Sequence, residues 1–309
     1  MNKALLLFSE GLDSTLAGLI LKREGLEVIA LRFITPFFGW QYKKEPQLFH
    51  SKCQALSFDS SILFDITEDY LEILKYPRFG YGEYANPCLD CKILLLKKAK
   101  EILHEVGADF LASGEVLGQR STSQSKGVLE KIEKEADVKG LLLRPLSAKL
   151  LKITEPEKKG IIKRENLYAH CGRQRSFQLE LAQKFGLKDI PTPAGGCLLT
   201  DPIKGSRTLK VLKERRSLTP LTAELLIMGR HFFEGDLWII LGRNEVENHR
   251  ILELAQGIFP LYTLSEPSPI SAVIEGKPEE SILKNLLLKY SKKAQKKLDE
   301  GGKVALLSL

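Results

Sequence analysis

The sequence is poor in histidine and methionine and has no long apolar run. It contains five histidines, which form no spacing typical of metal ligands, and two methionines. No apolar stretch reaches the roughly 20 residues that a membrane-spanning helix needs. The first residues show no signal-peptide pattern. We therefore expect a cytoplasmic protein with no membrane segment.

Cysteine is also scarce, with five among 309 residues. Cytoplasmic thiols stay reduced, so these five indicate metal or thiol chemistry rather than structural disulfides. Lysine and arginine number 46 against 39 acidic residues, a net charge of +7 that favours an anionic partner, with nucleic acid first. The length and the 43% hydrophobic content predict a globular protein of two domains.

Residues 4–8 form a continuous apolar run, typical of a strand buried on both faces of a parallel sheet. A polar turn follows at residues 9–15, and helical spacing then continues to about residue 25. Such a turn aims backbone N–H groups and the positive end of a helix dipole at one point, which suits a phosphate. The residues that would hold the phosphate, and magnesium in the case of the aspartate, are Ser9, Gly11, Asp13, Ser14 and Thr15.

This turn resembles the PP-loop, S-G-G-x-D-S, of the N-type ATP pyrophosphatases. Those enzymes split ATP between its α and β phosphates and adenylate a substrate oxygen. The sequence departs from the motif at Glu10, where the family usually has glycine. A carboxylate beside pyrophosphate is unfavourable unless it points outward or helps to hold magnesium. The alternative interpretation is an ordinary helix capped by serine or aspartate after a core strand.

The remaining pattern predicts an α/β fold with a doubly wound parallel sheet, followed by a smaller α+β domain. A second strand at 26–33 completes a strand–helix–strand unit, which makes the sheet parallel. Further strands are expected at 61–65, 109–113 and 141–144, and helices at 46–56, 68–74, 89–106, 127–136, 156–165 and 172–185. After residue 201 we expect helices at 207–215, 245–256 and 279–297, a strand at 237–241, and strands within 260–275. The predicted domains are residues 1–205 and 206–309.

Three cysteines form the most suggestive thiol pattern. Cys88 and Cys91 form a C-x-x-C at a helix start, where the dipole lowers thiol pKa values, and Cys197 follows two glycines that free the backbone. Three thiolates are too few for a closed zinc site but suit a 4Fe–4S cluster with one open iron. A persulfide route would need only Cys88 and Cys197. Cys53 is expected in the core, and Cys171 in the core or a turn.

A second polar segment follows the strand predicted at 109–113. Because ligands bind at the carboxyl ends of parallel strands, we expect this segment to face the loop at residues 9–15. It resembles the T-G-D/E-x-L-G-Q-x-x-S-Q segment of ThiI-type tRNA 4-thiouridine synthases. The residues that carry this resemblance and would line the nucleotide and uridine site include Ser113, Gly114, Gln119 and Gln124.

The resemblance covers roughly residues 1–205 and implies adenylation of a uridine carbonyl oxygen in tRNA by ATP, followed by displacement of AMP by sulfur. It implies that the turn at 9–15 holds pyrophosphate and Mg²⁺, and that the backbone at Arg32 and Phe33 contacts adenine. The sulfur donor would be sulfide or a persulfide carrier. The residues assigned to catalysis are Asp13, Cys88, Cys91 and Cys197, with the three cysteines as ligands of the cluster.

Two regions common in that family, a THUMP-containing region before the PP-loop and a rhodanese-like tail, are not evident in the sequence. The tail instead resembles the RNA-binding NFACT-R module, also called DUF814, in the segments G-R-H-F and W-I-I-L-G-R-N. Trp238 lies in an apolar strand and is expected in the core. The cations that could contact RNA phosphates are Arg230, His231, Arg243 and Arg250.

Two other functions remain open. One is a PP-loop enzyme that amidates a substrate or forms a nitrile, as in 7-deazaguanine synthesis, which usually gathers four cysteines as a zinc site. The other is a non-catalytic RNA-binding adaptor in which Glu10 marks a decayed site. The sequence does not indicate the oligomeric state.

Overall fold

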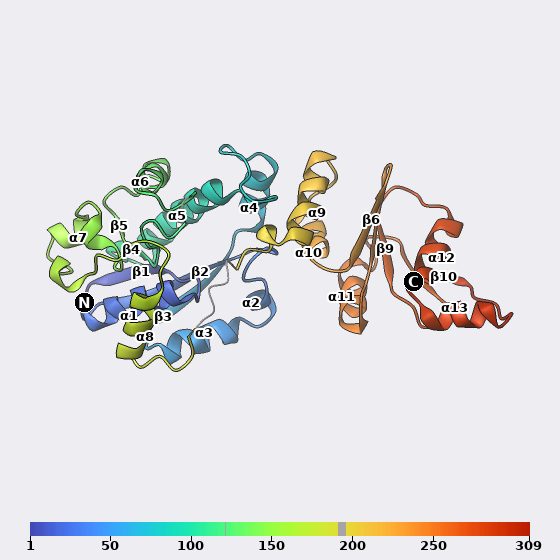
Figure 1. The fold of residues 1–309 in the computed structure, drawn as a ribbon, viewed down its shortest axis with the longest axis horizontal. Coiled ribbons are helices and arrows are strands. Elements are labelled where there is room, and N and C mark those ends of the chain that lie inside the picture. Colours follow the sequence, from blue (N-terminus) through green and yellow to red (C-terminus); the bar gives the residue numbers. More distant parts are fainter. Residues whose placement is uncertain (121, 191–195) are drawn as a thin grey trace. The chain divides into compact units, whose positions relative to one another are not determined.

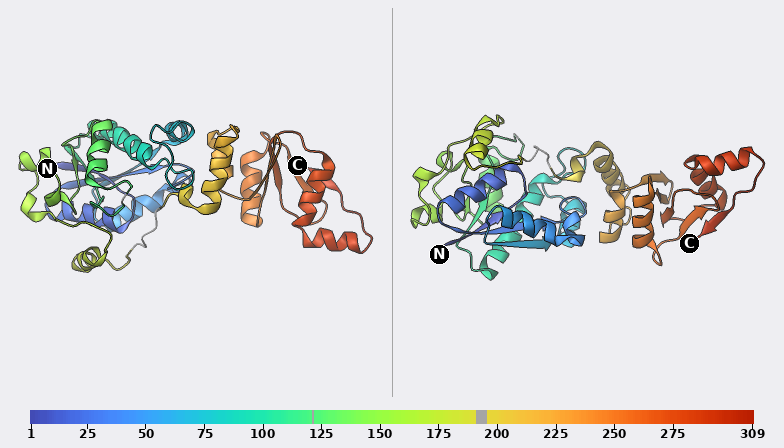
Figure 2. Two further views of the ribbon diagram at one scale, coloured as in Figure 1. Left: turned by 45° about the horizontal axis from the view of Figure 1, so that its top comes forward. Right: turned by 90° about the horizontal axis from the view of Figure 1, so that it is seen from below.

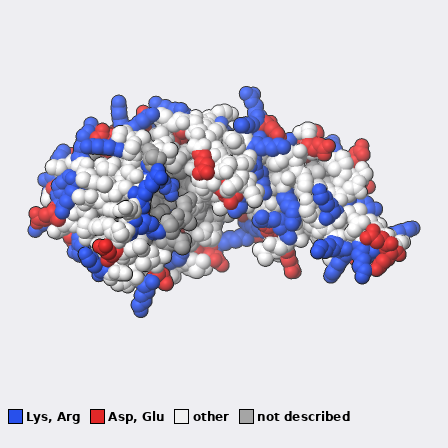
Figure 3. Space-filling model, in the orientation of Figure 1, with Lys and Arg blue, Asp and Glu red and all other residues white. Residues whose placement is uncertain are grey.

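The structure is a computed structural model that describes residues 1–120, 122–190 and 196–309 (Figure 1). The chain divides into two compact units, residues 1–205 and 206–309. No helix in the described ranges is long and apolar enough to cross a membrane. Lysine and arginine side chains are spread over the visible face of both units, with acidic side chains among them (Figure 3).

The first unit is built on a five-stranded parallel sheet in the order β3-β2-β1-β4-β5. Its strands are β1 (Lys3–Leu7), β2 (Glu27–Ile34), β3 (Ser60–Asp65), β4 (Phe110–Ser113) and β5 (Leu142–Leu143). The central strand β1 is apolar from Ala4 onward because neighbouring strands flank it and helices cover both faces. The predicted parallel α/β sheet is confirmed.

Helices cover both faces of this sheet. They are α1 (Leu12–Arg23), α2 (Gln41–Lys44), α3 (Pro46–Ala55), α4 (Thr67–Lys75), α5 (Cys88–Glu105), α6 (Lys126–Glu135), α7 (Glu155–Lys158) and α8 (Ser176–Lys184). In Figures 1 and 2, α5 and α6 lie on one side of the strands, and α1, α3 and α8 lie on the other. Short 3₁₀ helices lie at Ala148–Leu150, Arg164–Asn166 and Leu198–Thr200. The sheet is therefore doubly wound, as predicted.

Two predicted helices of this unit are shorter than expected. The helix expected at 156–165 ends at Lys158, because Gly160 takes a positive φ of 68° and breaks the helical path. The helix expected at 172–185 begins only at Ser176, after Gly172 with a φ of 88°. Gly160 lies inside one predicted range and Gly172 at the start of the other, and in both the positive φ is incompatible with a regular helix.

The second unit has a five-stranded antiparallel sheet in the order β10-β8-β9-β7-β6. Its strands are β6 (Arg230–Glu234), β7 (Leu237–Leu241), β8 (Leu261–Leu264), β9 (Ser271–Glu275) and β10 (Leu306–Ser308). Its helices are α10 (Pro220–Leu226), α11 (Glu245–Ala255), α12 (Glu280–Lys289) and α13 (Lys292–Asp299), and α9 (Pro202–Lys213) runs across the boundary between the units. Trp238 is fully buried, as predicted.

The single helix predicted at 279–297 is two helices. Ser291 separates α12 from α13 and caps α13, since its hydroxyl accepts from the N–H of Ala294 at 3.1 Å and donates to the carbonyl of Pro267 at 2.7 Å. This capping interaction stabilises the start of a new helix where the lysine-rich periodicity predicts continuation.

Candidate nucleotide and thiol site

The loops that follow β1 and β4 meet at the point where the strand order reverses. We call residues 9–15 the β1 loop and residues 114–120 and 122–125 the β4 loop. The chain passes from β1 to β2 and β3 on one side and returns through β4 and β5 on the other, which places both loops at the ligand-binding edge of the sheet. A side chain at Gly114 would overlap the backbone of Asp13 and Ser14. The amide of Gln119 donates to Asp13 Oδ2 at 2.9 Å. The expectation that these loops face each other is confirmed.

The β1 loop is held by its own hydroxyl groups. Ser14 Oγ and Thr15 Oγ1 donate to the carbonyl of Gly11 at 2.9 and 3.1 Å, and Ser9 Oγ lies 3.1 Å from Ser14 Oγ. Helix α1 has Gly11 at its N-cap and no side-chain cap. The interpretation of this turn as a serine- or aspartate-capped helix is therefore wrong. An N-terminus without a cap leaves N–H groups and the positive end of the dipole for an anion.

Asp13 carries a buried oxygen that lacks a partner. Oδ2 accepts from Gln119, whereas Oδ1 has no hydrogen-bond partner among the described residues. The hydroxyl of Ser113 and Oε1 of Gln124 are also buried without a hydrogen-bond partner among the described residues. Leaving such groups without partners costs about 1–3 kcal/mol each. A carboxylate oxygen of this kind fits Mg²⁺, which prefers oxygen ligands.

Glu10 is held by residues from β2, α2 and α3. Its Oε1 accepts from the hydroxyl of Tyr42 at 2.5 Å and from Nζ of Lys52 at 2.7 Å. Oε2 lies 3.8 Å from the guanidinium of Arg32. Its φ of 64° is in the left-handed region, which explains in physical terms why glycine suits this position of the motif.

Arg32 and Phe33 lie where β2 extends beyond β1. The β1–β2 ladder ends at the Leu7–Leu31 pair, while β2 continues against β3 up to Ile34. The Arg32 guanidinium lies near Glu10 and 6.0 Å from the Tyr42 ring centre. The buried Phe33 ring packs on Phe64 with centroids 6.1 Å apart. The backbone of both residues pairs with β3, and the buried Nε of Arg32 has no hydrogen-bond partner among the described residues.

The fold brings the three predicted cysteines together. Cys88 is the first residue of α5, Cys91 follows one turn later, and Cys197 precedes Leu198, whose N–H donates to the carbonyl of Phe37 at 2.8 Å. Burial raises the pKa of Cys91 well above its usual range, and the nearby thiols of Cys197 and Cys88 raise it further. Residues 191–195, which include the first of the two glycines before Cys197, lie outside the described residues.

The hydroxyl of Tyr70 belongs to the same group. Burial raises the pKa of this fully buried residue well above its usual range, and the thiols of Cys91 and Cys197 add to the effect. Within residues 1–120, 122–190 and 196–309, no three His, Cys, Asp or Glu side chains are arranged to hold a metal ion. The thiols are therefore close enough to interact but are not in a ligating arrangement.

The other two cysteines lie elsewhere. Cys53 is buried, as expected, and burial raises its pKa to about 11. Cys171 is exposed and pairs through its backbone with Leu117 of the β4 loop. The sequence predicts Cys171 in the core or in a turn, and its exposure excludes the core.

Sequence reasoning missed a buried charge network behind the β4 loop. Glu115 Oε1 lies 2.5 Å from Nζ of Lys92, and Oε2 accepts from Arg144 Nε at 3.0 Å. Arg144 also pairs with Glu133. Burial pushes the pKa of Glu115 upward, but the charges of Lys92 and Arg144 outweigh it and lower this pKa to about 2. Lys92 directly follows Cys91, so the network joins the cysteine-bearing helix to the β4 loop.

The cations expected to contact RNA are largely engaged within the second unit. Trp238 Nε1 donates to Nδ1 of His231 at 2.9 Å, so Nε2 donates to the carbonyl of Met228 at 2.8 Å. Burial lowers the pKa of His231 to about 3, so it is neutral near pH 7 and the prediction of a phosphate contact is wrong. The arginines make the following contacts: Arg230 over the Tyr290 ring, Arg243 with Glu247, and Arg250 with Glu224 and Glu253.

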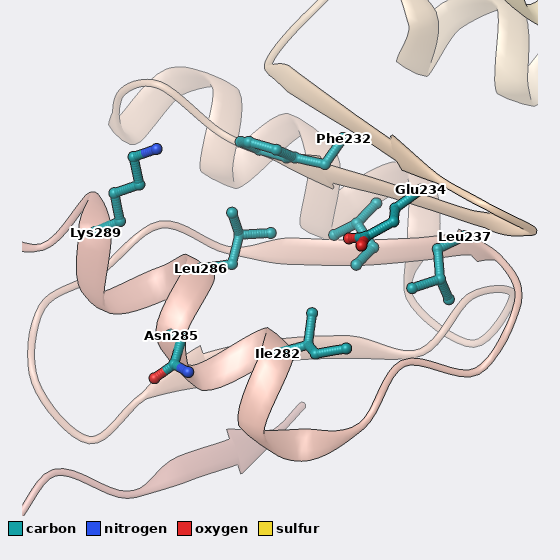
Figure 4. A pocket seen from close by; sticks show the side chains of 8 residues that line it. Phe232, Glu234, Leu237, Ile282, Asn285, Leu286 and Lys289 are labelled. Carbon is teal, nitrogen blue, oxygen red and sulfur yellow. The ribbon is translucent and has the colours of Figure 1, made fainter.

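The second unit also has an apolar groove that the sequence did not indicate. Its volume is about 380 Å³, and it lies between the β6–β7 hairpin and α12. Figure 4 shows Phe232 over one side, Leu286 and Ile282 facing it from α12, and Glu234 and Lys289 near its ends. None of the predicted site residues lines it.

Comparison with known proteins identifies relatives of the first unit. A family model described as thiamine biosynthesis protein (ThiI) matches residues 1–155. The tRNA-specific 2-thiouridylase MnmA of Petrotoga mobilis is 33% identical over 131 residues, which are 38% of this chain and 36% of that protein. The 7-cyano-7-deazaguanine synthase of Campylobacter jejuni is 38% identical over 66 residues, 21% of this chain and 29% of that protein. The chain thus spans about a third of the length of these curated relatives.

Two solved structures show a weaker likeness. A 4-thiouridine synthetase in complex with RNA and bound ATP aligns with a TM-score of 0.38 and 19% identity, over 69% of this chain and 53% of that one. The U34-tRNA thiolase NcsA from Methanococcus maripaludis, with its 4Fe-4S cluster, aligns with a TM-score of 0.34 and 18% identity, over 69% and 71%. Likeness at this level carries no argument about function. The family model is different, because it matches half of the chain, and this protein belongs to the ThiI family.

Proposed function

We propose that this protein uses ATP to replace a carbonyl oxygen of a uridine in tRNA by sulfur. The observation that carries the proposal is the contact between the β1 and β4 loops around Asp13, whose Oδ1 is buried without a partner. Membership of the ThiI family and 33% identity to a tRNA-specific 2-thiouridylase over 131 residues support the same substrate class.

In this proposal the β1 loop binds the pyrophosphate portion of ATP at the N-terminus of α1. Asp13 Oδ1 is the oxygen that would hold Mg²⁺, and the ion would supply positive charge beside the phosphates. The uridine oxygen attacks the α-phosphorus, and pyrophosphate leaves. The extended backbone at Arg32 and Phe33 receives the adenine. Ser113, Gly114, Gln119 and Gln124 line the nucleotide and uridine side from the β4 loop.

We further propose that Cys88, Cys91 and Cys197 hold a 4Fe–4S cluster. Three mutually interacting thiols match the donor set of a cluster with one open iron. The raised pKa values favour the protonated thiols, so the cluster would have to supply the positive charge that keeps them as thiolates. When bound, such a cluster would offer an iron that carries hydrosulfide, with sulfide or a persulfide carrier as donor. A persulfide on Cys88 or Cys197 is the alternative.

The function is tested by incubating the full chain with ATP, Mg²⁺, sulfide and unmodified tRNA. We expect pyrophosphate release that depends on tRNA, and a thiouridine in the nuclease digest. The 66-residue match to 7-cyano-7-deazaguanine synthase makes nitrile formation the second candidate. Pyrophosphate release driven by a small carboxylate substrate and not by tRNA would decide for that candidate. No turnover with either would favour the adaptor.

The cluster is tested by anaerobic purification of the wild type and single alanine variants. We expect brown protein that absorbs near roughly 400 nm, and loss of colour and thiolation in Cys88→Ala, Cys91→Ala and Cys197→Ala. Cys53→Ala and Cys171→Ala are the matched controls and should keep both. Colourless, iron-free protein that still thiolates tRNA, with Cys91→Ala active, would decide for the persulfide.

A further inference from the structure

The carboxylate of Glu10 has three polar partners outside the β1 loop. Three side chains converge on its carboxylate, from Arg32 on β2, Tyr42 on α2 and Lys52 on α3. Tyr42 and Lys52 also contact each other, with Lys52 Nζ 3.1 Å from the tyrosine oxygen. These side chains form one polar cluster, and Glu10 is its only member from the loop.

The backbone at Glu10 makes this arrangement unfavourable on local grounds. A φ of 64° is unfavourable for a residue with a Cβ, whereas glycine adopts it freely. The Glu10 side chain is 15% exposed, so partial desolvation of the carboxylate adds to the cost. The hydrogen bonds from Tyr42 and Lys52 offset both penalties, and the bond to Glu10 is the main reason that the pKa of Lys52 is raised.

Because Glu10 directly precedes the N-cap of α1, its contacts also restrain the β1 loop. The next residue is Gly11, whose carbonyl accepts from Ser14 and Thr15 and whose backbone begins α1. Tyr42 belongs to the buried core beside Phe49, with ring centroids 5.6 Å apart. A carboxylate fixed to the Tyr42 hydroxyl therefore fixes the entry to α1 relative to the core.

We propose that Glu10 is a positioning residue that anchors the β1 loop to α2 and α3 and so preorganises the N-terminus of α1 for the phosphates of ATP. The role in ATP binding rests on the proposed function, whereas the anchoring itself does not. Glycine would adopt this backbone conformation without strain, whereas Glu10 is held in it by contacts that glycine cannot make. Its presence is therefore not the mark of a decayed site.

The experiment uses the full chain and three variants. Glu10→Gln keeps an oxygen that accepts from Tyr42 and Lys52, while Glu10→Gly removes the anchor and relieves the backbone. Asp137→Gly is the matched control, because Asp137 also has a positive φ of 54° and pairs with a lysine, Lys100, at 2.6 Å. Asp137 lies just after α6, and its hydrogen bonds among the described residues are with Lys100 and the carbonyl of Lys134 rather than with either loop.

Two readouts are measured, amide hydrogen exchange of residues 9–15 without ligand, and MgATP affinity by calorimetry. Glu10→Gly should exchange faster in this loop and bind MgATP about tenfold more weakly, because preorganisation is lost. Glu10→Gln should stay within about threefold of wild type. Asp137→Gly should match wild type in both readouts, with any effect confined to thermal stability.

The outcomes separate this inference from the proposed function. Unchanged loop exchange in Glu10→Gly, or MgATP binding equal to or tighter than wild type, would overturn the positioning role. Failure of the wild type itself to bind MgATP would overturn the proposed function, while the exchange measurement still decides the anchoring. A further check is Lys52→Met, which should add no loss to Glu10→Gly if both act through the same contact.

Discussion

The two carboxylate oxygens of Asp13 lie in different environments. One oxygen is oriented by Gln119 from the opposite loop, and the other is buried without a partner. The first contact fixes the rotamer, and the second oxygen remains for a cation. One oriented oxygen and one oxygen without a partner are expected of a side chain that binds Mg²⁺. A helix cap would instead accept a hydrogen bond from a backbone N–H, which Asp13 does not do among the described residues.

Asp13→Asn should remove most nucleotide turnover and leave the fold intact. The amide keeps the size of the side chain and can still meet Gln119, but it loses the charge that holds Mg²⁺. Loss of one such electrostatic contact costs about 3 kcal/mol, or roughly a hundredfold in rate. Pyrophosphate release with tRNA measures the effect, and an unchanged melting temperature serves as the control. Activity equal to wild type would remove Asp13 from the site.

His231 should make the second unit sensitive to acid. Its pKa of about 3 in the fold lies below the ordinary 6.5, so the unfolded chain binds a proton that the fold excludes. The contribution of neutral His231 to the free energy of unfolding is fully present above pH 6.5. Below that pH the free energy of unfolding should fall by about 1.4 kcal/mol per pH unit. Denaturant unfolding at pH 7.5, 6.5 and 5.5 measures this slope. His231→Gln should reduce it, and an equal slope in both proteins would contradict the burial.

The individual contacts differ in how far the sequence could predict them. The residues proposed to bind ATP in the β1 loop are predicted from a short pattern of serine, glycine and aspartate. The partners of Glu10 and the Trp238–His231 bond do not, because both depend on side chains that distant strands and helices bring together. From the segment G-R-H-F alone, the histidine is expected to be an exposed cation. Its neutral, hydrogen-bonded state depends on the pairing of its strand with the strand that carries Trp238.

At the scale of elements, the network around Glu115 joins three parts of the first unit. Lys92 comes from α5, Arg144 follows β5, and Glu115 begins the β4 loop. Lys92 also donates to the carbonyl of Ser123 at 3.1 Å, near the other end of that loop. The network therefore fixes the β4 loop against the helix that starts with the two cysteines.

Glu115→Gln should destabilise the first unit at neutral pH, and the difference from wild type should shrink in acid. The pKa of Glu115 is about 2 in the fold against an ordinary 4.5, so its stabilisation is present above pH 4.5 and is lost as the pH falls toward 2. The shift corresponds to roughly 3 kcal/mol. Urea unfolding of both proteins between pH 7 and pH 3 measures it. A difference that stays constant over this range would contradict a charge effect.

Element types were easier to predict than element ends. The strands of the parallel sheet are short, largely apolar runs bounded by glycine or polar residues and separated by helices, which is the pattern that the sequence shows. The sequence predicts one helix at 279–297 because its lysine and leucine periodicity continues across Ser291. The structure has two helices there, since the capping role of Ser291 depends on a bond to Pro267 in another part of the unit. The contact of the β1 and β4 loops was predictable, since it follows from the topology of a parallel sheet.

At the scale of the whole molecule, the fold brings together residues that are distant in sequence. Cys197 joins Cys88 and Cys91 only because the segment before α9 returns to Phe37 on the loop that follows β2. The sequence could pair these cysteines by resemblance but could not show that Tyr70 lies among them. The second unit is a compact unit with its own hydrophobic core.

We expect the second unit to supply much of the affinity for tRNA. Helix α13 carries four lysines, Lys292, Lys293, Lys296 and Lys297, and only the last two pair with acidic side chains, Glu300 and Glu266, in the ion pairs of the described chain. Each cation that contacts phosphate adds to an affinity that falls steeply with salt. Residues 1–213 retain α9 whole and are the suitable truncated chain.

Full-length protein and residues 1–213 should therefore differ in tRNA binding far more than in ATP turnover. Binding is measured by fluorescence anisotropy at 50 and 200 mM salt, where phosphate contacts make affinity fall by orders of magnitude. The truncated chain should bind more weakly at both and show a shallower salt dependence. Circular dichroism of the truncated chain establishes that its α/β fold is retained. Equal affinity and equal salt dependence would assign the RNA surface to the first unit, where the β1 and β4 loops meet.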